Sequence, residues 1–232
     1  MHDDLRQQVY EANLALQKRG LVVFTWGNVS GIDRRHGVIA IKPSGVSYEK
    51  LTPESIVLVD LQGSVMEGDL RPSSDTPTHL ELYRSFPGVG GVCHTHSTYA
   101  TMWAQAQREI PCFGTTHADH FYGPVPVTDA LTHDEIDGPY EQNTGLVIVR
   151  RFAQIDPLQM PAVLVANHGP FTWGKTAAQS VENAVVLEQV ALMAYGTLVV
   201  NARQDCISQA LLDRHYLRKH GAGAYYGQSR PP

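Results

Sequence analysis

The sequence predicts an α/β fold, in which a single domain has a central, mainly antiparallel β-sheet flanked by helices on both faces. Short β-rich runs bounded by Gly, Pro, Asp or Asn alternate along the chain with longer segments of helical periodicity. The 232 residues are 43% hydrophobic and 18% charged, which suits one sizeable core. We expect one domain over residues 1–228 and a flexible tail over residues 229–232.

The expected helices start where a capping residue or an apolar periodicity marks them. Leu5, Val9, Ala12 and Leu16 recur at helical spacing before Gly20, which predicts a helix over residues 3–19. The further helices are predicted over residues 77–86 after Thr76, 98–107 after Ser97, 177–200 and 207–220. The expected strands cover residues 21–24, 38–42, 56–60, 89–95, 146–149 and 162–166. Their hairpin-like order indicates antiparallel pairing.

Charge and cysteine content exclude several classes of protein. A net charge of −5 without a basic run argues against a nucleic-acid surface. Cys93, Cys112 and Cys206 are widely separated and form no Cys-x-x-Cys pair, so neither a disulfide framework nor a thiol redox site is expected. A reducing cytoplasm fits this pattern best.

No membrane association is expected either. The chain opens with Met1-His2-Asp3-Asp4, whose acidic residues are unlike a signal peptide. The most apolar stretch, residues 184–200, is interrupted by Glu188 and Gln189, and it reads as too short and too polar to cross a bilayer.

Three separate segments together suggest a metal site. His94 and His96 stand two apart in an expected strand, so both imidazoles project from one face and can reach a single ion. His168 follows an apolar strand just before a Gly-Pro turn, and Asp75 precedes an expected helix. Three histidines and a carboxylate suit a zinc-like cation, and an open coordination position would distinguish a catalytic ion from a structural one. The alternatives are a chance His-x-His pair and an Asp75 that only caps the turn.

Small polar pairs stand at the ends of several expected elements. Gly27-Asn28, Ser44-Gly45 and Ser73-Ser74 offer backbone amides and short polar side chains that can surround an anion. Each pair taken alone reads equally well as a turn, and the sequence contains no Walker-type glycine loop.

The motifs are similar to those of a known family along nearly the whole chain. They are Thr25-Trp26-Gly27-Asn28-Val29-Ser30, Lys42-Pro43-Ser44-Gly45-Val46, Pro72-Ser73-Ser74-Asp75-Thr76-Pro77-Thr78-His79, His94-Thr95-His96-Ser97, Gly114-Thr115-Thr116-His117-Ala118-Asp119, His168-Gly169-Pro170-Phe171 and His215-Tyr216-Leu217-Arg218-Lys219-His220-Gly221. With this set the chain resembles the class II aldolase family, which includes sugar-phosphate epimerases and the adducin head, and it resembles the epimerases most.

The resemblance implies a specific set of site residues. A divalent metal, Zn²⁺ first and Mn²⁺ or Co²⁺ as alternatives, would be held by His94, His96 and His168 with Asp75 as an additional ligand. Asp119 and Tyr226 match the acid/base pair of the epimerases, and no nicotinamide is implied. The implied phosphate pocket consists of Gly27, Asn28, Lys42, Ser44, Gly45, Ser73 and Ser74.

The implied activity is the conversion of L-ribulose 5-phosphate to D-xylulose 5-phosphate by retro-aldol cleavage, rotation of the aldehyde and re-addition, as arabinose or ascorbate catabolism requires. The resemblance also implies a homotetramer in which Tyr226 reaches the site of a neighbouring subunit. One rival reading is an aldolase of the L-fuculose 1-phosphate type, although such aldolases carry a catalytic glutamate at the position of Asp75. Another is a non-catalytic binding module like the adducin head.

Overall fold

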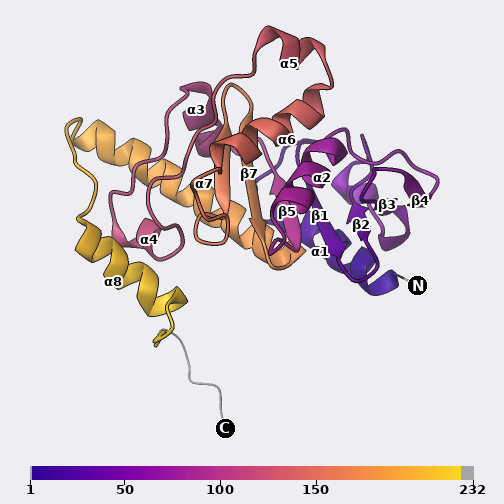
Figure 1. The fold of residues 1–232 in the computed structure, drawn as a ribbon, viewed down its shortest axis with the longest axis horizontal. Coiled ribbons are helices and arrows are strands. Elements are labelled where there is room, and N and C mark those ends of the chain that lie inside the picture. The colour runs from indigo at the N-terminus through magenta and orange to yellow at the C-terminus, as the bar shows by residue number, and fades with distance from the viewer. Residues whose placement is uncertain (1, 226–232) are drawn as a thin grey trace.

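A seven-stranded antiparallel sheet forms the centre of the protein in the computed structural model, which describes residues 2–225 (Figure 1). The strands lie in the order β4-β3-β2-β1-β5-β7-β6, and each pairs antiparallel with its neighbours. They are β1 (Asn28–Asp33), β2 (Val38–Ile41), β3 (Val57–Asp60), β4 (Val65–Glu67), β5 (Gly91–His94), β6 (Ala162–Val165) and β7 (Gly169–Gly174). The predicted fold class is confirmed.

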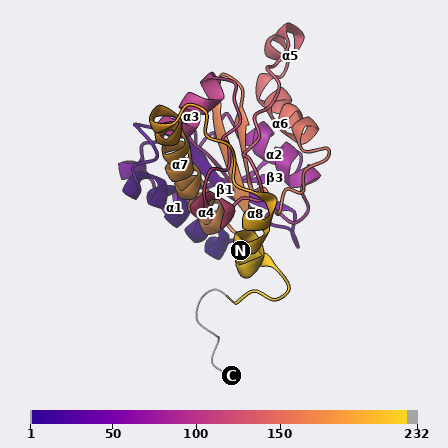
Figure 2. The same cartoon turned by 90° about the vertical axis from the view of Figure 1, so that its left-hand side faces the viewer.

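Helices cover both faces of this sheet, with α1 and α7 on one face and α2 and α6 on the other (Figure 2). The helices are α1 (Asp3–Lys18), α2 (Thr76–Ser85), α3 (Thr98–Gln105), α4 (Thr115–Ala118), α5 (His133–Asp137), α6 (Tyr140–Arg151), α7 (Ala177–Val200) and α8 (Gln209–His220). Two short 3-10 turns, Tyr48–Lys50 and Pro53–Ser55, precede β3.

The apolar stripe predicted for the first helix faces the sheet. Val9, Ala12 and Leu16 of α1 are buried against Val29 of β1 and Ala184 of α7. Full burial of a side chain such as Val9 or Leu16 contributes roughly 1.5–3 kcal/mol of hydrophobic stabilisation. On the opposite face, side chains of α2 and α6 join the larger core cluster that runs under the strands.

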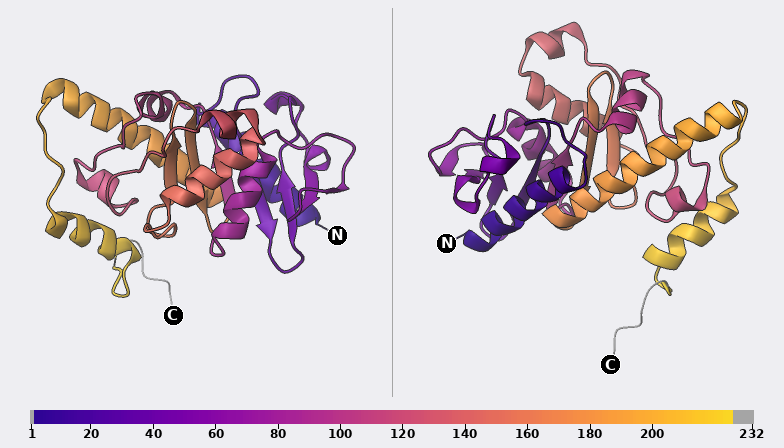
Figure 3. Two further views of the ribbon diagram at one scale, coloured as in Figure 1. Left: turned by 45° about the horizontal axis from the view of Figure 1, so that its top comes forward. Right: turned by 180° about the vertical axis from the view of Figure 1, so that it is seen from behind.

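Helix α7 is long and apolar enough to cross a membrane by length and composition alone, which corrects the expectation that this stretch is too short and too polar to do so. In the structure it lies beside α1 and packs across β5 and β7, as the view from behind shows (Figure 3). The carboxylate of Glu188 accepts the backbone N–H groups of Tyr99 (2.9 Å) and Ala100 (3.0 Å) at the start of α3. Glu188 therefore caps a neighbouring helix, which accounts for an acidic residue in an apolar stretch.

Two expected strands are wrong. Residues 21–24 form no strand, and Phe24, where a turn begins, has a φ of 53°, which is outside the extended region of a strand. Residues 146–149 belong to α6, where Thr144, Val147 and Ile148 are buried at helical spacing. In both cases a short β-branched run is consistent with a strand, but its surroundings require another conformation.

Candidate metal centre

The site lies where three central strands meet. Asn28 at the start of β1 stands opposite His94 at the end of β5, and His94 stands opposite Phe171 of β7. His168 directly precedes β7, and Asn167 before it has a φ of 63°, which Asn tolerates better than most residues. A Cβ at Gly169 would lie 2.9 Å from the carbonyl oxygen of Thr95, so glycine lets this turn approach the histidine segment closely.

The three histidines converge on one point. One ligand nitrogen from each of His94, His96 and His168 lies within 4.8 Å of the others, and the Nε2 atoms of His94 and His96 are 3.1 Å apart. His94 Nδ1 donates a hydrogen bond of 3.0 Å to the carbonyl oxygen of Pro170, which leaves its Nε2 lone pair for a metal. The Nδ1 atom of His168 lies 3.5 Å from the Tyr140 hydroxyl.

The electrostatics of the site keep the rings of His96 and His168 neutral. Burial lowers the pKa of His168 to about 4, and the adjacent His94 adds to this lowering. The pKa of His96 also falls to about 4, first because its ring is partly desolvated and then because of His94, although the side chain opens to the cavity. Neutral imidazole is the form that binds metals, and a site with three histidine ligands leaves a position for substrate. The donor set therefore fits a divalent cation.

Asp75 lies beside the histidines but outside their compact group. It stands at the N-cap of α2, and its Oδ2 accepts a hydrogen bond of 2.6 Å from Asn28 Nδ2. Burial raises its pKa, but the charges of His94 and His79 and the Asn28 hydrogen bond outweigh burial, so the pKa lies below its usual value. Asp75 is therefore an anion on the wall of the site, and its role as a metal ligand stays a prediction.

A cavity of about 590 Å³ contains both the histidines and the residues of the expected phosphate pocket. Its lining comprises Thr25, Trp26, Gly27, Asn28, Lys42, Pro43, Ser44, Gly45, Ser73, Ser74, Asp75, His94, His96 and His168. Residues from separate parts of the sequence thus form one concave surface with hydroxyls, backbone amides and one cation.

Lys42 and Gly27 both line the cavity. Lys42 is 2% exposed, its Nζ donates a hydrogen bond of 2.6 Å to the Val46 carbonyl oxygen, and burial lowers its pKa to about 8. The ammonium thereby fixes the turn that presents Ser44 and Gly45. Gly27 has a φ of 82°, and a Cβ there would lie 2.7 Å from the His94 carbonyl oxygen, so a side chain would displace the metal segment.

A comparison with models of known protein families shows to which family the chain belongs. The family model described as "Class II Aldolase and Adducin N-terminal domain" matches residues 7–195. The chain belongs to this family. Class II aldolases use a divalent metal, and His94, His96 and His168 are the group that could bind one here.

Solved structures share the class II aldolase fold over almost the full chain. An L-fuculose 1-phosphate aldolase is 24% identical with a TM-score of 0.78, over 94% of this chain and 96% of its own. YgbL from Klebsiella pneumoniae, described as a putative aldolase/epimerase/decarboxylase, is 24% identical with a TM-score of 0.72, over 92% of this chain and 98% of its own. The L-fuculose-1-phosphate aldolase from Thermus thermophilus is 22% identical with a TM-score of 0.69, over 88% of this chain and 100% of its own.

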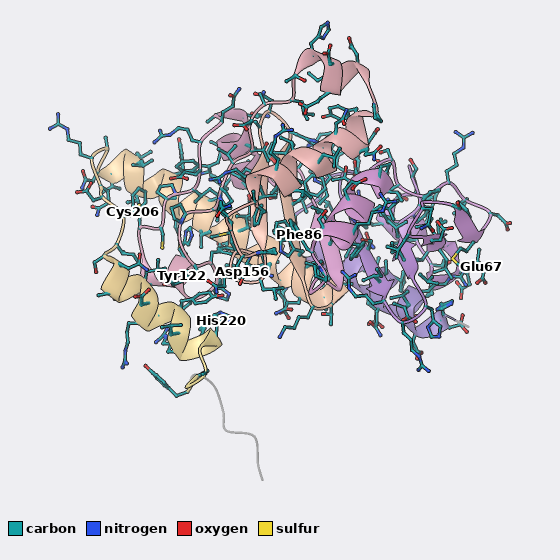
Figure 4. The ribbon with its side chains drawn as sticks, viewed as in Figure 1. Glu67, Phe86, Tyr122, Asp156, Cys206 and His220 are labelled. Carbon is teal, nitrogen blue, oxygen red and sulfur yellow. The ribbon has the colours of Figure 1, made fainter. Side chains whose placement is uncertain are left out.

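Asp119, one of the two acid/base residues expected from the class II aldolase resemblance, lies outside the lining of this cavity. Asp119 follows α4 and pairs with α8, through Arg218 (2.8 Å) and His215 (3.0 Å), and it is not among the residues that line the cavity. His220, labelled on α8 in Figure 4, donates to the Asp119 backbone carbonyl oxygen. Burial raises the pKa of Asp119, but Arg218 and His215 hold it below its usual value. Tyr226 lies outside the described residues, so the acid/base pair stays a prediction.

Two aromatic residues at the class II aldolase site are not singled out by the sequence. The Trp26 ring, which lines the cavity, lies 6.3 Å from the His96 ring, and the Tyr140 ring stacks at 6.3 Å on His168. Trp26 stands inside a motif that the sequence displays, so its place in the site could have been inferred. Tyr140 starts a helix that the sequence did not reveal, and nothing near it in sequence marks it.

Proposed function

We propose that the protein is an L-ribulose 5-phosphate 4-epimerase that forms D-xylulose 5-phosphate in the cytoplasm. The proposal rests on the shared cavity. Its lining contains three histidines that suit a metal and a set of hydrogen-bond donors that suit a phosphate. Asp75 stands where related aldolases have a catalytic glutamate, which favours the epimerase. Either arabinose or ascorbate catabolism would supply the substrate.

The wall around Lys42 would hold the phosphate. Ser44, Ser73 and Ser74 offer hydroxyls, and the Lys42 ammonium adds a positive charge near them. Holding the phosphate at this wall would keep a two-carbon fragment inside the cavity while its other end turns. His94, His96 and His168, with Asp75, would hold a divalent ion, and that ion would supply Lewis-acid chemistry.

Inversion at carbon 4 by simple proton removal is difficult, because the hydrogen on that carbon is not acidic. Removal of the carbon 4 hydroxyl proton instead lets the bond between carbons 3 and 4 break, and its electron pair stays with the three-carbon fragment. Glycolaldehyde phosphate then turns and accepts the same carbon on its opposite face, and the new alkoxide takes up a proton. Asp119, held ionised by Arg218 and His215, and Tyr226 would act as proton acceptor and donor.

Asp119 does not line the cavity of its own chain, so the proposal includes an assembly of subunits. A homotetramer with sites at the interfaces would allow groups from a neighbouring chain to complete each cavity. The exposed apolar side chains Val199 and Val200 at the end of α7 and Leu217 on α8 are consistent with contact between subunits.

The second candidate is a class II aldolase that releases its two fragments. The likeness to L-fuculose 1-phosphate aldolases favours it, although identities of 24% and 22% support the fold alone. A non-catalytic module like the adducin head is disfavoured, because such a module needs neither a histidine group nor a polar cavity beside it.

A coupled assay separates these functions. We expect zinc-loaded protein to convert L-ribulose 5-phosphate to D-xylulose 5-phosphate without added nicotinamide and to leave L-fuculose 1-phosphate intact. Cleavage of L-fuculose 1-phosphate with no epimerisation would establish the aldolase, and inactivity on both substrates would contradict both enzyme proposals.

The mechanism has its own test in heavy water. Cleavage between carbons 3 and 4 leaves the hydrogen of carbon 4 on the aldehyde fragment, so the product should carry no deuterium at that carbon. Proton NMR of the isolated D-xylulose 5-phosphate measures this. Deuterium at carbon 4 would replace the cleavage mechanism by deprotonation.

A further inference from the structure

A second group of metal-ligand side chains lies outside the cavity, where α1 begins beside the turn between β1 and β2. It consists of His2, Asp33 and His36, whose ligand atoms all lie within 4.8 Å of one another. None of the three lines the cavity that contains His94. Neither the class II aldolase motifs nor the proposed reaction uses them.

The two carboxylate oxygens of Asp33 have different partners. Oδ1 accepts the backbone N–H groups of Arg35 (3.0 Å) and His36 (3.3 Å), which fixes the carboxylate in the turn. Oδ2 faces the two rings, at 2.6 Å from His36 Nδ1 and 3.9 Å from His2 Nδ1. The ring centroids are 5.6 Å apart with planes at 71°, so the imidazoles are not stacked. A carboxylate anchored through one oxygen thus presents its other oxygen to both imidazoles.

Acidic side chains beside the group add to the negative charge of Asp33. Asp3 and Asp4 in the first turn of α1 add negative charge next to His2. Arg34, which follows Asp33 directly, donates instead to the backbone carbonyl oxygens of Tyr83, Phe86 and Val89 at 2.7–3.1 Å. The side chains of His2, Asp33 and His36 are 15%, 29% and 49% exposed, so the group is held in place and open to ions from solution.

We propose that His2, Asp33 and His36 form a second metal site, which binds a divalent transition-metal ion of the zinc class. Two imidazoles and one carboxylate are a common ligand set for such ions. Ligands at about 2.0–2.1 Å from a tetrahedral ion lie roughly 3.3–3.5 Å apart. The separations of 2.6 and 3.9 Å bracket this value, so small side-chain movements bring the atoms to bonding distance.

Binding requires one proton to move and no redox step. The Nδ1 proton that His36 shares with Asp33 passes to its own Nε2, because neutral imidazole carries its proton on either nitrogen. Water molecules complete the coordination, since the described chain provides three ligands. The bound ion would join the start of α1 to the β1–β2 turn.

The test uses untagged full-length protein that already carries one equivalent of Zn²⁺. Calorimetric titration with further Zn²⁺ should show a second equivalent bound by wild type. His36→Ala and His2→Ala should each weaken this second binding at least tenfold. His133→Ala is the matched control, because His133 also pairs with a carboxylate, Asp137 at 3.5 Å, but belongs to no group of three ligands among the described residues. It should bind like wild type.

Thermal unfolding gives an independent readout. The second equivalent of Zn²⁺ should raise the Tm of wild type and of His133→Ala, and it should leave the Tm of His36→Ala unchanged. Circular dichroism confirms that each variant is folded, and turnover of sugar phosphate should be the same in all of them. Absence of a second bound equivalent in wild type, or equal second-site affinity in His36→Ala, would overturn the proposal.

Discussion

At the scale of single residues, the candidate site depends on side chains that are oriented by second contacts. His94 is the clearest case, because its hydrogen bond to the Pro170 carbonyl oxygen decides which ring nitrogen is free. The pairing of His94 with His96 could be predicted from their spacing alone. The contact with Pro170 could not, since it joins residues that only the folded sheet brings together.

Each single replacement of His94, His96 or His168 by Asn should lower the amount of bound metal and abolish turnover. Removing one of three ligands weakens binding, while Asn keeps a similar size and polarity at a site with room for it. Metal analysis after dialysis, together with the coupled assay, measures both effects. Three variants with full metal and full activity would place the metal centre elsewhere.

Replacing Lys42 by Met should raise KM for the sugar phosphate about tenfold and leave bound metal unchanged. The substitution removes a charge near the phosphate wall and the hydrogen bond that fixes the Ser44 turn, and a hydrogen bond to a charged group is worth about 1.5–3 kcal/mol. Steady-state kinetics and metal analysis test this. An unaltered KM would show that Lys42 serves the fold and not the substrate.

At the scale of elements, the sequence indicates most helices and hides strands that contain glycine or proline. Strand β7 begins with Gly169-Pro170, which reads as a turn, yet it lies inside the sheet between β5 and β6. The segment 146–149 resembles a strand because four apolar residues show no clear period. For both segments, the secondary structure is determined by the strand or helix that pairs or packs with it, and that partner is distant in sequence.

Any side chain at Gly91 should disrupt the contact between β5 and α7. A Cβ there would lie 2.4 Å from the Ala177 backbone nitrogen and 2.5 Å from its Cα, so the strand and the helix would have to separate. We expect Gly91→Ala to lower the free energy of unfolding by about 2 kcal/mol or more. Gly196→Ala in α7 is the control, since nothing lies within 4 Å of its Cβ, and it should be neutral or stabilising. Urea unfolding of both variants measures this, and equal stabilities would contradict it.

At the scale of the whole molecule, buried neutral histidines make the fold sensitive to acid. His117 is 4% exposed, its Nε2 donates to the Gly123 carbonyl oxygen at 2.8 Å, and burial lowers its pKa to about 4. An unfolded histidine has a pKa of about 6.5, so the unfolded chain takes up a proton first as the pH falls. The stabilisation is therefore complete above about pH 6.5 and declines toward about pH 4.

Between pH 7 and pH 5, His117 should account for a loss of about 2 kcal/mol in the free energy of unfolding of metal-free protein. His117→Gln keeps a donor for the Gly123 carbonyl oxygen but does not titrate, so its stability should fall less over this range. Urea titrations at both pH values make the comparison. An identical decline in the two proteins would mean that other groups cause it.

Assembly can be tested by mixing inactive variants. Asp119→Asn and Tyr226→Phe should each be nearly inactive, and unfolding and co-refolding them in equal amounts should restore about a quarter of the sites if the two groups come from different chains. A mixture of Asp119→Asn with His168→Asn then shows whether Asp119 serves its own histidines. Reassembled protein without regained activity in the first mixture, when wild type recovers, would contradict a divided acid/base pair.

The register of the central strands has a consequence for biosynthesis. His94 reaches its place only when β1 on one side and β7 on the other have paired with β5, and these strands come from distant parts of the chain. A ribosome-bound chain that ends before residue 168 therefore lacks the coordination sphere. An ion that binds all three histidines is therefore acquired only after residue 168 has been synthesised, and the metals present at that late moment influence which cation the site takes up.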